Sequence, residues 1–116
     1  MEESALDYPI STPQALASLV EYQPDSVVSR VVFRGAGGTV TVFAFSGKQG
    51  LSEHTNPNDA LIHVLSGEVS VLIAGAKHHV REGEMLHLPP SVPHELVGGG
   101  PFKMVLTLLN RPRTAG

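Results

Sequence analysis

The sequence predicts an all-β protein, an antiparallel jelly-roll β-barrel with a short N-terminal helix. From Ser26 onward, apolar and polar residues alternate over short runs that are rich in β-branched side chains. Glycine-rich breaks separate these runs at fairly even spacing, and each break can supply the positive φ of a tight turn. Helical periodicity is confined to one short segment near the start. Many short strands with one marginal helix outside them are typical of a barrel or jelly roll.

Residues 1–25 are expected to form an N-terminal arm and the short helix. Thr12 is suited to cap the helix, and Pro13 has the φ required at the first helical position. Apolar residues then recur on one face between Ala15 and Val20, and the segment ends before Pro24. No chemistry is expected from this part of the chain.

Residues 26–110 are expected to form the barrel, and residues 111–116 a frayed tail. The strand-like runs are Val27 to Phe33, Thr39 to Phe45, Ala60 to Leu65, Val69 to Ile73, His78 to Val80, Met85 to Leu88, His94 to Val97 and Phe102 to Leu109. No internal repeat or low-complexity segment interrupts them. A chain of 116 residues forms one domain.

Composition excludes several classes of function. The net charge is −3 and the lysines and arginines are scattered, so no basic surface for nucleic acid is expected. The chain has no cysteine, which excludes a thiolate metal site and a cysteine nucleophile. No apolar run is long enough for a membrane span, and the acidic start is unlike a signal peptide, so we expect a cytoplasmic protein with no membrane partner. Charged residues make up only 16% of the chain, which favours a homodimer that covers part of the surface.

The six histidines all fall between positions 54 and 94, and four of them lie within two longer motifs. Residues 50–68 read GLSEHTNPNDALIHVLSGE, and residues 83–94 read GEMLHLPPSVPH. These segments resemble the first and second conserved motifs of the cupin superfamily, with a short hairpin between them as in the smallest single-domain cupins. The resemblance covers residues 50–98 and implies the conserved β-barrel of that family.

The resemblance also implies a metal site, which this chain retains only in part. In the family the first motif supplies two histidines and a glutamate, and the second motif supplies one more histidine. His54 matches the first of these ligands and His94 the last. Asn56 stands where the second histidine would be, and Ala60 where the glutamate would be. Two imidazoles and an amide would bind a divalent transition metal such as Zn, Fe, Mn or Ni only weakly.

Strand alternation indicates which other residues face the site. If position 60 points into the barrel, Ile62 and Val64 do so as well, and His63 points away. The same reasoning places Leu86 and Leu88 inside and His87 outside. Asp59 follows a turn beside the site and is a better placed carboxylate ligand than Glu53, whose neighbour His54 points inward. The expected ligand-binding residues are therefore His54, Asn56, Ile62, Val64 and His94, and Asn56 and Asp59 are additional candidates for a metal.

Three functions from different classes agree with these residues. The first is a binding module that holds a small polar metabolite in an apolar pocket, with His54, Asn56 and His94 as its polar groups. The second is a metal-dependent enzyme of the isomerase, lyase or dioxygenase kind that uses His54 and His94. The third is a structural dimer that has lost the use of its pocket. The missing ligands favour the first, because loss of the glutamate also removes the expected general base.

Overall fold

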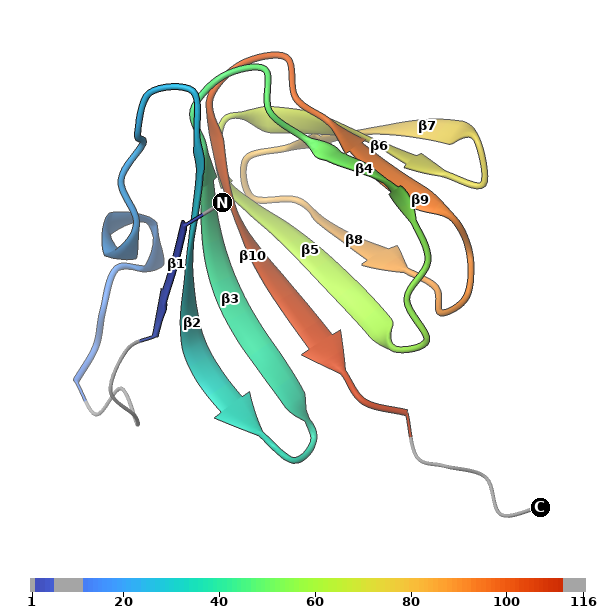
Figure 1. The fold of residues 1–116 in the computed structure, drawn as a ribbon, viewed down its shortest axis with the longest axis horizontal. Coiled ribbons are helices and arrows are strands. Elements are labelled where there is room, and N and C mark those ends of the chain that lie inside the picture. Colours follow the sequence, from blue (N-terminus) through green and yellow to red (C-terminus); the bar gives the residue numbers. More distant parts are fainter. Residues whose placement is uncertain (1, 6–11, 112–116) are drawn as a thin grey trace.

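A computed structural model describes residues 2–5 and 12–111 of the chain. Two β-sheets face each other and enclose the core, as Figure 1 shows. Among the described strands, every pair is antiparallel except the pair formed by the first two. The predicted all-β jelly-roll class is therefore confirmed. Among the described residues, no helix has the length and hydropathy needed to span a membrane.

The larger sheet has six strands in the order β1-β2-β3-β10-β5-β8. Their bounds are β1 Glu2–Ala5, β2 Val27–Gly35, β3 Gly38–Phe45, β10 Phe102–Leu109, β5 Asp59–Ser66 and β8 Met85–Leu88. The last long strand of the chain, β10, pairs with β3 on one side and β5 on the other. This insertion brings residues from the two ends of the barrel sequence into one sheet.

The smaller sheet has four strands in the order β4-β9-β6-β7. Their bounds are β4 Leu51–His54, β9 His94–Val97, β6 Glu68–Ile73 and β7 Ala76–Arg81. The β6–β7 hairpin turns through Ala74 and Gly75, which both have positive φ. Because β4 and β9 are neighbours, the two sequence motifs meet in this sheet.

The core lies between the sheets and is made of the inward side chains of the alternating strands. On β5 the buried residues are Ala60, Ile62 and Val64, as the alternation predicts. On β8 Leu88 is buried, Leu86 is partly buried and His87 is exposed. Phe45 and Phe102 stack within this core with their ring centroids 4.3 Å apart.

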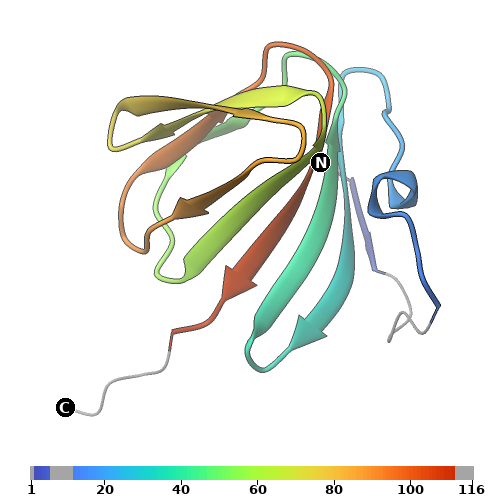
Figure 2. The ribbon, with the colours of Figure 1, turned by 180° about the vertical axis from the view of Figure 1, so that it is seen from behind.

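The N-terminal helix is shorter than the sequence predicts. Among the described residues of this segment, only Leu16–Leu19 are helical, as one 3-10 turn, η1, which has no side-chain cap. Thr12 is not the cap, because the turn begins at Leu16 and its N-cap residue is Ala15. Thr12 Oγ1 instead accepts a hydrogen bond from Gln14 Nε2. The turn lies on the outer face of the larger sheet, as Figure 2 shows. There Leu16 and Leu19 pack against a second apolar cluster with buried Val20, Val42 and Val105. So short a segment depends on this packing rather than on helix propensity.

Two strands lie outside the predicted runs. Glu2–Ala5, expected in an N-terminal arm, form β1 and pair in parallel with β2. Leu51–His54 form β4, which has no buried residue and no alternation that would reveal it. Of the expected tail, Arg111 is described, and residues 112–116 lie outside the described part of the chain.

Candidate functional site

A small cavity opens between the two sheets and has a volume of about 50 Å³, which is room for a few water molecules. Its apolar lining residues are Leu51, Ala60, Ile62, Leu88, Leu96, Met104, Leu106 and Leu108. Its polar lining residues are His54, Asn56 and His94. The cavity is therefore an apolar chamber whose polar side chains come from the two sequence motifs.

The structure brings together most of the residues that the sequence proposed for this site. His54, Asn56, Ile62 and His94 all line the cavity. Val64 is fully buried in the core and is not among the lining residues. Met104, Leu106 and Leu108 also line the cavity and were not predicted, although their alternation along β10 is a signal that the sequence contains.

His54 and His94 face each other across β4 and β9. Their Nε2 atoms are 3.2 Å apart, and the ring planes are inclined at 70°. A one-residue shift in the pairing lies between Leu51, which is opposite Leu96, and His54, which is opposite His94. Without that shift His54 would lie opposite Pro93, so this irregularity creates the imidazole pair.

Backbone carbonyls determine the tautomers of both rings. Nδ1 of His54 donates to the carbonyl of Ser52 at 2.8 Å, and Nδ1 of His94 donates to the carbonyl of Val92 at 3.2 Å. A carbonyl oxygen only accepts, so Nδ1 carries the hydrogen in each ring. In the neutral pair both Nε2 atoms therefore present lone pairs to each other. Such a pair favours a cation or a hydrogen-bond donor between or beside the two nitrogens.

Burial favours the neutral form of the His94 imidazole. His94 is only 5% exposed, and this desolvation lowers its pKa. The bond to the Val92 carbonyl opposes the shift, and the nearby His54 adds to it. His54 is exposed at the other side of the pair. The buried ring is thus suited to accept a hydrogen bond or to coordinate, rather than to carry charge.

Asn56 has a structural role that limits what its amide can do. Its Oδ1 accepts a hydrogen bond from the backbone N–H of Asn58 at 2.8 Å, which forms a local turn. Its backbone carbonyl accepts from the N–H of Ser91 at 2.7 Å and so joins the two motifs. Because both oxygens of Asn56 accept these hydrogen bonds, its amide nitrogen is the group suited to a ligand, and it acts as a donor.

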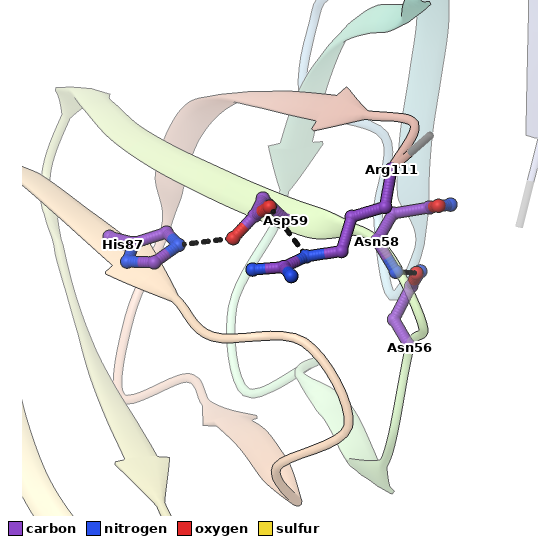
Figure 3. Close-up of polar contacts among 5 residues, drawn as sticks. All are labelled: Asn56, Asn58, Asp59, His87 and Arg111. Atoms are coloured by element: carbon purple, nitrogen blue, oxygen red, sulfur yellow. Dashed lines mark hydrogen bonds and ion pairs between the residues drawn. The ribbon is translucent and has the colours of Figure 1, made fainter. Parts of the chain in front are cut away.

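Asp59 does not line the cavity and therefore does not join the imidazole pair. It is the first residue of β5, and alternation turns it to the face opposite Ala60. There, as Figure 3 shows, Oδ1 accepts from His87 Nε2 at 2.8 Å and Oδ2 accepts from Arg111 Nε at 3.1 Å. The hydrogen bond from His87 lowers the pKa of Asp59. Burial opposes this shift, and the hydrogen bond and positive charge of Arg111 add to it. Both oxygens already have donors on the outer face.

The remaining histidines also lie away from the cavity. His63 is half-buried on the outer side of β5, and His78 is exposed on β7. His79 lies 3.1 Å from Glu68 in an exposed pair. Strand alternation therefore predicted correctly that His63 and His87 lie outside the barrel.

A complete divalent-metal centre does not fit these residues. Two Zn–N bonds of about 2.1 Å would span the 3.2 Å between the Nε2 atoms at an angle of about 100°, so the pair itself suits coordination. Ala60 offers no ligand, Asp59 faces outward and the Asn56 oxygen is used in a turn. Across residues 2–5 and 12–111, no group of three His, Cys, Asp or Glu side chains is arranged to hold a metal ion.

Comparisons with known proteins agree with this architecture. The family model described as Cupin domain matches residues 31–108, which is more than half of the chain. No curated protein sequence matches. A conserved protein of unknown function from Streptococcus pyogenes is similar in structure, with a TM-score of 0.85 and 25% identity over 93% of this chain and 95% of that one.

Two further solved structures carry the family name. A cupin superfamily protein from Desulfitobacterium hafniense has a TM-score of 0.84 and 26% identity, over 91% of this chain and 97% of that one. A Cupin 2 conserved barrel domain protein from Leptotrichia buccalis has a TM-score of 0.78 and 34% identity. That match covers 81% of this chain and 46% of the longer relative.

Proposed function

Because the chain belongs to the cupin domain family, we propose that it is a binding protein for a small polar metabolite, held in the cavity between its sheets. The observation that carries the proposal is the pairing of an apolar chamber with one polar group of defined chemistry, the His54–His94 pair. The ligand would place an apolar part against residues such as Ile62 and Leu88. Its polar end would donate a hydrogen bond to the imidazole nitrogens.

The ligand is small and carries a donor group. A cavity of about 50 Å³ accommodates only a few heavy atoms unless its walls move. Both Nε2 atoms accept, and the Asn56 amide nitrogen donates. A hydroxyl or protonated acid group on a short carbon skeleton matches this arrangement. The partners of the chain in this proposal are a small molecule and, from its low charge, a second copy of itself.

The experiment is a thermal-shift screen of the purified protein against small carboxylic acids, alcohols and sugars. A compound that binds only the folded state at about one hundred times its Kd adds about 2.7 kcal/mol of stability and so raises Tm by several degrees. We expect one chemical class to raise Tm in the parent chain and in a His78→Ala control, whose substituted residue is exposed on β7. His54→Ala and His94→Ala should lose the shift.

The outcome that contradicts this proposal favours the structural alternative. If no compound of the screen raises Tm, the pocket is not a binding site for these classes. A dimer without a ligand would then be the better description of the protein.

A metal-dependent enzyme is the second candidate, because the two Nε2 atoms converge at a separation that suits coordination. Substrate or water atoms would have to complete the ligand set. We expect protein purified without a chelator to carry well under one equivalent of Zn, Fe, Mn or Ni, measured by inductively coupled plasma mass spectrometry. Near-stoichiometric metal that disappears in His54→Ala or His94→Ala would favour the enzyme over the binding protein.

A further inference from the structure

A polar cluster on the outer face of the larger sheet lies directly behind the cavity wall. Asp59, His87 and Arg111 belong respectively to the start of β5, to β8 and to the segment that follows β10. The Asp59 carboxylate receives one donor from each side, at 2.8 Å from His87 and 3.1 Å from Arg111. The cluster therefore connects three neighbouring strands of the larger sheet, β10, β5 and β8. It lies at the start of β5, which follows the β4–β5 connection that contains Asn56.

The cavity wall is built from the same three strands. Leu108 on β10 is opposite Ala60 on β5, and Ala60 is opposite Leu88 on β8. All three of these side chains line the cavity. Each is close in sequence to a member of the outer cluster, since Asp59 precedes Ala60, His87 precedes Leu88, and Arg111 follows Leu108 by three residues. A change in the spacing of the strands on the outer face would therefore change the shape of the wall.

The strands on either side of β5 in this wall, β8 and β10, are the ones that the cluster supports. β8 has only four residues and is the edge strand of its sheet, paired with β5 alone. The end of β10 is held on its other side by Asn110, which donates to the carbonyls of Ala36 and Gly37 in the β2–β3 turn. Arg111 supplies the matching contact toward β5. It lies beyond residue 108, where the family match ends.

We propose that Asp59, His87 and Arg111 form a clamp that holds β8, β5 and β10 in register behind the cavity and so positions the wall against which a ligand packs. The role in positioning the wall for a ligand rests on the proposed binding function. His87 and Arg111 are positioning residues, because they touch neither the cavity nor the imidazole pair. Asp59 is the shared acceptor that joins them.

Amide hydrogen exchange followed by NMR tests the clamp without a ligand. In His87→Ala and Arg111→Ala, we expect the amides of β8 to exchange about three to ten times faster, while those of β9 keep their parent rates. His87→Gln should restore part of the protection, because its amide nitrogen can donate to Asp59. His78→Ala and Arg81→Ala, at exposed positions on β7 in the other sheet, are the matched controls. Parent-like β8 exchange in both clamp variants would overturn the proposal.

Xenon, a probe of small apolar cavities, tests the consequence for binding. We expect xenon to shift the methyl resonances of Ile62 and Leu88 in the parent chain. The affinity of the cavity for xenon should fall about two- to fivefold in Arg111→Ala, because a looser wall must be ordered when xenon binds. No xenon shift in the parent chain would contradict the cavity proposal but leave the exchange result to decide the clamp. Equal xenon affinity alongside faster exchange would show that the clamp does not position the wall.

Discussion

At the scale of single residues, the site depends on side chains held in unusual environments. His94 is buried with its Nδ1 committed to the Val92 carbonyl, and its Nε2 faces His54. Three residues earlier, Ser91 has a φ of 61°, in the left-handed region that favours glycine. Ser91 also donates its backbone N–H to Asn56, so its conformation joins the two motifs. Strain at Ser91 thus accompanies the geometry that orients His94.

Ser91→Gly should stabilise the protein. Glycine removes the steric cost of the left-handed conformation, about 1 kcal/mol, although it gives back part of this through a more flexible unfolded chain. We expect a net gain of about 0.5 kcal/mol in the free energy of unfolding, measured by urea denaturation. Ser91→Ala is the control, because alanine keeps the strain. An equal gain in both variants would show that the hydroxyl, not the backbone, is responsible.

The stability of the protein should fall as the pH falls below 6.5, in part because of His94. Its pKa in the folded state is lowered from 6.5, mainly by burial, so the unfolded chain binds a proton more readily. The loss in the free energy of unfolding begins near pH 6.5 and grows as the pH falls. It is complete below the pKa of His94 in the folded state. We expect His94→Gln to reduce the dependence of Tm on pH between pH 7.5 and 5.5. His78→Gln should retain the parent dependence, and an unchanged dependence in His94→Gln would exclude this role for His94.

At the scale of secondary structure, the positions of the strands depend on close backbone contacts as well as on alternation. β4 has little burial of its own, and its pairing with β9 is irregular. Gly50 precedes β4 at a close approach to the end of β9, where an added Cβ would lie 2.2 Å from the Leu96 carbonyl oxygen. Gly98 makes the reciprocal approach, with an added Cβ at 2.1 Å from the Gln49 carbonyl oxygen. These glycines allow β4 to reach the register that pairs His54 with His94.

Gly50→Ala should destabilise the protein, because the clash is with backbone that cannot rotate away. We expect a loss of about 2 kcal/mol in the free energy of unfolding, measured by urea denaturation. Gly99→Ala is the matched control, since an added Cβ there meets nothing within 4 Å, and its effect should stay within about 0.5 kcal/mol. A Gly50→Ala protein as stable as this control would mean that β4 moves aside without cost.

At the scale of the whole molecule, the cavity exists because β10 is inserted between β3 and β5. This insertion places Met104, Leu106 and Leu108 in the wall opposite the smaller sheet. It also brings Arg111 beside Asp59, more than fifty positions earlier in the chain. Homodimerisation, expected from the low charge, stays a prediction that sedimentation can test.

The sequence by itself determined the fold class and the two histidines of the site. Alternation and glycine turns are local signals, so they located all the long strands and the inward face of β5. The first motif identified His54, which ends a strand that alternation could not reveal, because β4 buries none of its side chains. The same local reasoning overestimated the helix, whose single turn depends on packing against the sheet.

Only the tertiary structure decided how these residues meet. The one-residue shift between β4 and β9, the wall supplied by β10 and the outward orientation of Asp59 all involve partners far away in the sequence. Pairing register and sheet closure depend on non-local contacts, and a short window of sequence does not contain them. The sequence therefore identified His54 and His94, and the fold placed their nitrogens 3.2 Å apart at the polar end of an apolar cavity.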